Sequence, residues 1–191
     1  MPEEPSEAAQ QHAAHLRAAE FAALRHAISV RGTARMVLAP VVCAAWAALA
    51  LALVVYSGIP AAVLIPLGVL AAGFEAVHAL HVGAERIGRY LQVNYEEVGG
   101  PQWETVAMTV GPALPGGGLD PLFTAVFVGI AVLNLLVGVL PAPVWQEMVF
   151  LVACHALFVF RVIRARVAAA RQRAVELESF RALLLRQRDR Y

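Results

Sequence analysis

The sequence predicts an all-α, polytopic membrane protein: a bundle of four transmembrane helices with helical cytoplasmic extensions. Hydrophobic residues make up 60% of the 191-residue chain, compared with about 45–50% in soluble domains. No charged residue occurs between Met36 and Phe74 or between Pro121 and Gln146. All 15 basic residues are Arg, and they fall on one side of the predicted spans.

The uncharged tracts divide into segments of about 20 residues, the length that crosses the hydrocarbon core of a bilayer. The spans are predicted at residues 36–56, 60–82, 121–140 and 144–163. Short turns containing Pro join the first span to the second and the third to the fourth. Residues 35–163 therefore form the predicted transmembrane bundle.

The distribution of Arg predicts the orientation of the chain. Four Arg precede the first span, two lie between the second and third, and nine follow the fourth. Basic residues stay on the cytoplasmic side, so both chain ends are expected in the cytoplasm and the protein in the inner membrane of a bacterium. The lipid bilayer is the first expected partner, and a net charge of +1 gives no general attraction to nucleic acid.

Residues 1–34 are predicted to form a cytoplasmic N-terminal helix. Ser6 is a suitable N-cap for a helix that starts at Glu7 and continues to about Val30. Gly32 and Thr33 are expected to bend the chain before the first span.

The inner loop, residues 98–120, is bracketed by Gly and Pro. The second span is expected to continue as a helix to about Glu97, and a short helix is predicted at Gln102–Val110. Trp103 and Glu104 begin this short helix. They form either an interfacial anchor or a gate over the polar residues of the second span.

Residues 164–191 are predicted to prolong the fourth span as a cytoplasmic helix. Its apolar residues recur at spacings of four and three, which is typical of a coiled-coil seam. These residues are Ile163, Val167, Ala170, Ala174, Leu177 and Leu184. The seam favours packing within one chain or between copies in a homo-oligomer or membrane complex. The alternative is an Arg-rich helix lying along anionic lipid.

One face of the second span and its continuation carries a polar stripe. Its members are Glu75, His78, His81, Glu85, Arg89, Gln92 and Glu96. An ionisable residue inside a bilayer costs roughly 2.5 kcal/mol or more and marks a site to be explained. We expect Glu75, His78 and His155 of the fourth span to form one cluster, and Asn134 supplies a polar side chain on the third span.

The polar stripe favours a transport-type protein, with two alternatives left open. A transport-type protein would move or sense a small ion or proton along Glu75, His78, His81, Glu85 and Arg89. A membrane subunit or scaffold would instead bind a partner through its cytoplasmic helices. A metal could bind Glu75, His78 and His155, and haem could lie between the two histidines. The sequence carries no nucleophile, phosphate-loop or metalloprotease motif, so an enzyme is not favoured.

Overall fold

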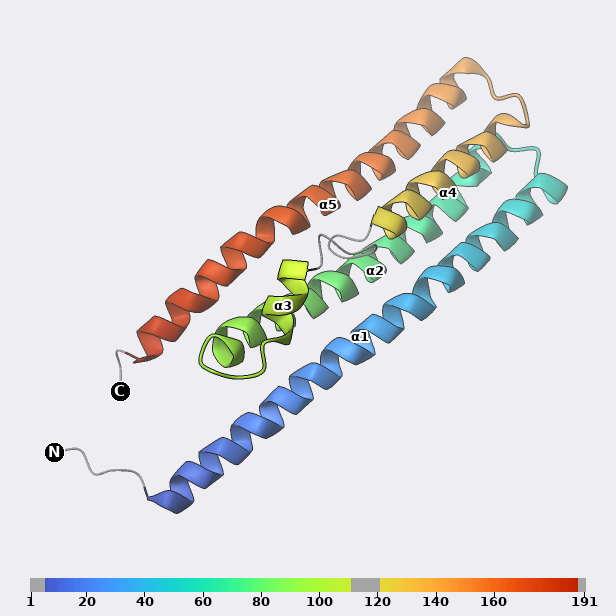
Figure 1. Cartoon of the computed structure of the whole chain (residues 1–191). Helices are drawn as coiled ribbons and strands as arrows, with labels where there is room; N and C mark the ends of the chain where they lie inside the picture. The colour runs from blue at the N-terminus through green and yellow to red at the C-terminus, as the bar shows by residue number, and fades with distance from the viewer. Residues whose placement is uncertain (1–5, 111–120, 189–191) are drawn as a thin grey trace.

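The computed structural model describes residues 6–110 and 121–188, and every regular element in these two ranges is a helix. The elements are α1 (Glu7–Tyr56), η1 (Pro60–Val63), α2 (Leu64–Leu91), η2 (Gln92–Glu96), α3 (Trp103–Val110), α4 (Pro121–Val139) and α5 (Trp145–Arg188). The four long helices lie side by side and alternate in direction, so both chain ends are at the same end of the bundle (Figure 1). The predicted all-α fold is confirmed.

Helix α1 is continuous over 50 residues, a length of about 75 Å. The Ser6 hydroxyl accepts a hydrogen bond from the Ala9 amide and caps the helix as predicted. The predicted bend at Gly32 and Thr33 is wrong. Arg31 lies over Gly83 of α2, and Arg35 donates a hydrogen bond to His81 of α2. Contacts on both sides of Gly32 therefore hold α1 straight along α2.

Helix α2 begins with a 3₁₀ turn, η1, and ends in a π-helical turn, η2, at Glu96. The predicted continuation of this helix to about Glu97 is thus confirmed. The short helix of the inner loop is also confirmed as α3, which lies beside the far end of α2 (Figure 1). The remainder of the inner loop, residues 111–120, lies outside the described residues.

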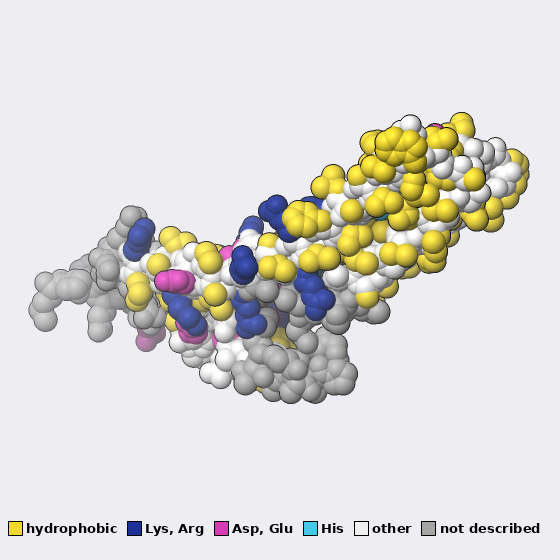
Figure 2. All heavy atoms as spheres, turned by 90° about the horizontal axis from the view of Figure 1, so that it is seen from above, with side chains coloured by type: hydrophobic (Ala, Val, Ile, Leu, Met, Phe, Trp, Pro, Cys, Tyr) yellow, Lys and Arg dark blue, Asp and Glu magenta, His cyan; other side chains and the backbone are white. Residues whose placement is uncertain are grey.

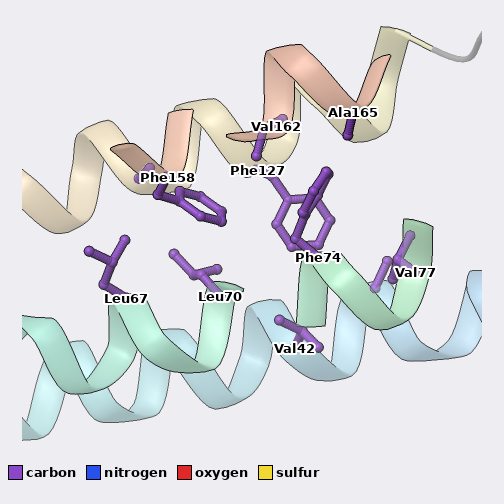
Figure 3. Close-up of a cluster of buried hydrophobic side chains, with 11 residues drawn as sticks. Val42, Leu67, Leu70, Phe74, Val77, Phe127, Phe158, Val162 and Ala165 are labelled. Atoms are coloured by element: carbon purple, nitrogen blue, oxygen red, sulfur yellow. The ribbon is translucent and has the colours of Figure 1, made fainter. Parts of the chain in front are cut away.

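Helix α2 supplies the centre of the hydrophobic core. Leu67, Leu70, Phe74 and Val77 are buried at helical spacings of three and four. They meet side chains of α1, α4 and α5 (Figure 3). These partners include Val42, Phe127, Phe158, Val162 and Ala165. The α1–α2 approach needs a small residue, since a Cβ atom at Gly73 would collide with the Val42 side chain.

One half of the molecule has an apolar surface, which we call the apolar belt. It consists of exposed large side chains on α1, α4 and α5 and in the turn after α4, among them Met36, Leu51, Tyr56, Leu133, Leu140, Trp145, Leu157 and Phe160. Arg and Glu side chains gather on the other half (Figure 2). We call that half, formed by residues 7–34, 83–107 and 164–186, the stalk.

Three helices are long and apolar enough to cross a membrane. These are Glu7–Tyr56, Pro60–Glu96 and Trp145–Arg186. The fourth apolar segment among the described residues, Phe123–Val139 of α4, is shorter. The three long helices are also those that extend beyond the apolar belt into the stalk.

The first part of the predicted α5 seam points away from the bundle. Ile163 is 49% and Val167 46% exposed, whereas Ala165 and Ala169, on the opposite side of the helix, are buried. Leu177 and Leu184, farther along the seam, are half-buried. Packing of the seam within the chain or between copies therefore stays a prediction. Small and polar side chains decide the packing face, as the contacts of Glu176 show below.

Candidate functional site

Arg89 is the centre of the polar stripe, and its side chain is only 3% exposed. Its Nη2 lies 2.5 Å from Glu85 Oε2, one turn earlier on α2. Its Nη1 lies 2.6 Å from Glu176 Oε2 on α5. Two carboxylates from two helices therefore share one buried guanidinium, and burial strengthens such charge-assisted hydrogen bonds.

Further contacts extend this arrangement toward α5. Glu176 also accepts hydrogen bonds from Arg86 Nε at 3.0 Å and from Gln172 Nε2 at 2.7 Å. Its carboxylate is therefore held by three side chains, two of them cationic. We call Glu85, Arg86, Arg89, Gln172 and Glu176 the stalk lock, because they fasten α5 to α2.

On the other side, the stalk lock is joined to α1. His81 Nε2 lies 3.4 Å from Glu85 Oε1, and His81 Nδ1 accepts a hydrogen bond from Arg35 Nη1 at 2.8 Å. An acceptor Nδ1 places the imidazole proton on Nε2, facing the carboxylate. The predicted polar stripe is thus a chain of contacts that links α1, α2 and α5.

Glu75 does not lie in the centre of the bundle. Its carboxylate is 49% exposed and pairs at 2.7 Å with Arg161 Nη2 of α5, which is 45% exposed. His78, one turn away, stacks on the Phe74 ring and lines a pocket between the helices. The Glu75 carboxylate was expected to need a buried cluster of histidines. Instead, Arg161 pairs with it at the surface of the bundle.

His155 belongs to a second, separate polar cluster. His155 Nδ1 donates to the Leu151 carbonyl at 2.7 Å, which leaves Nε2 to accept from Asn134 Nδ2 at 3.0 Å. Asn134 Nδ2 also donates to the Val63 carbonyl at 2.9 Å, and its Oδ1 accepts from Trp46 Nε1 at 2.9 Å. We call these the Asn134 cluster.

The predicted cluster of Glu75, His78 and His155 is therefore wrong. The physical reason is the supply of nearer partners: Arg161 neutralises Glu75, and Asn134 satisfies His155. Asn134 and His155 are both buried, and their polar atoms are paired across α1, η1, α4 and α5.

These contacts give no support to a metal or haem site. No group of three or more His, Cys, Asp or Glu side chains that could hold a metal ion occurs within residues 6–110 and 121–188. Both ring nitrogens of His155 are already engaged with protein atoms. Axial ligation of haem by His155 would require breaking one of these buried hydrogen bonds.

No protein family, curated protein or solved structure matches this chain.

Helix α3 is held in place by two carboxylates. Glu96 is buried and accepts hydrogen bonds from the Glu104 and Thr105 amides at 2.6 and 2.8 Å, and from the Thr105 hydroxyl at 2.7 Å. These amides belong to the first turn of α3, where they lack intrahelical partners. A carboxylate there also meets the positive end of the helix dipole.

Glu104, the predicted gate residue, is an anchor of α3. Its carboxylate lies 2.5 Å from Arg25 Nη1 of α1. Burial raises the pKa of the Glu104 carboxyl, with Glu96 adding to the increase, while Arg25 acts in the opposite direction. Trp103, beside it, has a side chain 63% exposed. Docking of α3 thus depends on Glu96 and Glu104 rather than on Trp103.

Replacing Glu96 with Ala is expected to release α3 from η2. The change removes three hydrogen bonds and the helix cap, and loss of a cap costs about 1–2 kcal/mol. Hydrogen exchange at residues 103–107 should then become roughly 5- to 30-fold faster. Glu97→Ala is the matched control, because Glu97 pairs with exposed Arg181 of α5 and not with α3 in the described part of the chain. Equal exchange at 103–107 in the two variants would contradict the capping role.

Several residues that hold the helices together could not be recognised from the sequence. Glu176 lies in an Arg-rich tail and resembles an ordinary surface charge. Trp46 falls in the middle of the first predicted span, and Arg25 resembles a solvated base. The i, i+4 spacing of Glu85 with His81 and with Arg89 on α2 could be recognised from the sequence alone.

Proposed function

We propose that this protein is a non-enzymatic membrane scaffold: its four helices cross the bilayer, both chain ends are cytoplasmic, and α5 pairs with α5 of a second copy. The observation that carries the proposal is the outward position of three residues of the α5 seam. Ile163 and Val167 are about half exposed, and Ala174 is exposed on the same face. A heptad-spaced apolar face that its own bundle leaves open suits a helix from another chain.

The apolar belt supports the membrane position. Its exposed side chains surround a half of the molecule that carries few charges, whereas a soluble protein rarely exposes such a large apolar patch. Tyr56 and Trp145 lie at its far end, where aromatic residues favour the membrane interface. Helix α4 has 19 residues, about 28 Å, which is close to the thickness of a hydrocarbon core.

A bilayer would also favour pairing through the seam. Two copies inserted with the same orientation present α5 in parallel, and the two seams then meet in register. The stalk lock keeps each α5 fixed against its own α2, so pairing requires little ordering of the helix. The paired stalks would offer a rigid cytoplasmic surface to further partners.

An ion- or proton-conducting role along the stripe is the second candidate. The contact chain from Arg35 through His81 and Glu85 to Arg89 favours it, since neighbouring titratable groups can pass protons. The chain runs toward the stalk, however, and Phe74, Phe127 and Phe158 fill the bundle between the helices. The contacts therefore favour a scaffold over a continuous pathway.

Disulfide crosslinking tests the scaffold proposal. In a chain whose two native cysteines are replaced by Ala, Ala174→Cys should form a dimer on mild oxidation of native membranes. Val175→Cys is the control, because Val175 is 63% exposed but lies about 100° away from the seam. Equal crosslinking of both variants, or none, would contradict pairing through α5. Proton flux in liposomes that Glu85→Gln abolishes would favour the second candidate instead.

A further inference from the structure

A pocket between all four long helices lies where the apolar belt meets the stalk. Its volume is about 60 Å³, which is enough for several water molecules or the head of a small polar ligand. Phe74, Phe123 and Phe127 form part of its apolar wall. Its polar lining comes from α1, α2, α4 and α5 as Arg35, His78, His81, Thr124 and Arg166.

The polar lining is basic. It contains two guanidinium groups and two imidazoles, and no carboxylate occurs among the lining residues that the structure describes. The nearby acids lie outside the lining and already have basic partners. Glu75 pairs with Arg161, and Glu85 pairs with Arg89 and lies 3.4 Å from His81 Nε2. Guanidinium groups at an apolar pocket whose own lining has no carboxylate are a feature of anion-binding sites.

Arg35 provides a second, independent indication. Its Nη1 donates to His81, and its guanidinium carbon lies 4.9 Å from the centre of the Phe123 ring. Its Nε atom is buried and has no hydrogen-bond partner in the described part of the chain. A buried donor without an acceptor costs about 1–3 kcal/mol, and a bound anion would supply the missing acceptor.

We propose that this pocket binds a phosphate group, with Arg35 and Arg166 as its guanidinium ligands. Arg suits phosphate because its planar donors match the phosphate oxygens. The phosphate belongs either to an anionic phospholipid head group or to a free anion. The lipid source rests on the proposed membrane position, since the pocket would then lie at the level of the cytoplasmic head groups.

Ligand-induced thermal stabilisation of the full-length protein in detergent tests the proposal. The probes are a short-chain phosphatidylglycerol, the matching phosphatidylcholine, and inorganic phosphate, all at constant ionic strength. Phosphatidylglycerol is expected to raise the unfolding temperature of the wild type in a saturable manner. A comparable rise with inorganic phosphate identifies a free-anion site, and a rise with phosphatidylglycerol alone identifies the head group.

Variants connect the effect to the pocket. Arg166→Gln removes an exposed base from the pocket lining and should weaken binding at least threefold, and Arg35→Gln should weaken it further. Arg164→Gln is the matched control, because Arg164 is also exposed on α5 but does not line the pocket. No saturable shift with either phosphate probe, or an unchanged affinity in Arg166→Gln, overturns the proposal. Failure of α5 crosslinking would leave this result unaffected, so the two proposals fail separately.

Discussion

Arg89→Met is expected to release the stalk part of α5 from α2. The local stability of α5 should fall by about 3–5 kcal/mol, which is the cost of removing one partner from a buried ion pair. The Glu85 and Glu176 side chains are only 23% and 13% exposed, and both would lose the cation between them. Hydrogen exchange over residues 172–186 should accelerate by at least about 100-fold. The apolar belt should remain folded, because its core contacts do not involve Arg89.

Two further variants make this result specific. Arg86→Ala removes another cation from Glu176, but Arg86 is 54% exposed, so the cost should stay within about 1 kcal/mol. Adding Glu85→Gln and Glu176→Gln to Arg89→Met should restore much of the protection, since no buried charge is then left unpaired. Exchange in Arg89→Met that matches Arg86→Ala would show that the stalk lock does not hold α5.

Asn134→Leu is expected to cost roughly 2 kcal/mol of bundle stability. Leu has a similar volume, so the main effect is the loss of hydrogen bonds to Trp46, Val63 and His155. Hydrogen bonds between membrane helices contribute about 0.6 kcal/mol on average and up to about 1.7 kcal/mol. The measurement is the free energy of unfolding in mixed micelles of increasing SDS content, followed by circular dichroism.

Trp46→Phe is the matched comparison, because it removes one of these hydrogen bonds and retains an aromatic ring. Its cost should be about 0.6 kcal/mol. The double variant should cost less than the sum of the two single changes, since both remove the same Trp46–Asn134 contact. Equal stability of Asn134→Leu and Trp46→Phe would show that Asn134 does not organise its cluster.

Local sequence features were sufficient to predict the long helices and the positions of several helix ends. Ser6 caps α1 as expected, and the second span continues to η2. The length of an apolar segment and the presence of Pro in a turn are local features, so they predict structure without reference to the rest of the fold. The predicted bend at Gly32 is absent because a single Gly destabilises a helix by only about 1 kcal/mol. The contacts of Arg31 and Arg35 with α2 outweigh that cost.

The pairing of polar residues required the tertiary structure. The depth of Glu75 and His155 could be counted from the spans, but the rotation of each helix could not. That rotation places Arg161 beside Glu75 and Asn134 beside His155. Similar depth along neighbouring helices is therefore a weak guide to contact, since side chains at one level can point in opposite directions.

Composition and spacing are enough to predict long apolar helices whose Arg residues gather at one end. Which face of each helix lies inside depends on the tertiary contacts, as the buried Ala165 and Ala169 of α5 show. Apolar spacing alone does not identify the inner face, because large apolar side chains also cover the outside of these helices. Small residues that permit close approach and polar residues that need partners, Gly73 and Arg89 among them, then select the packing.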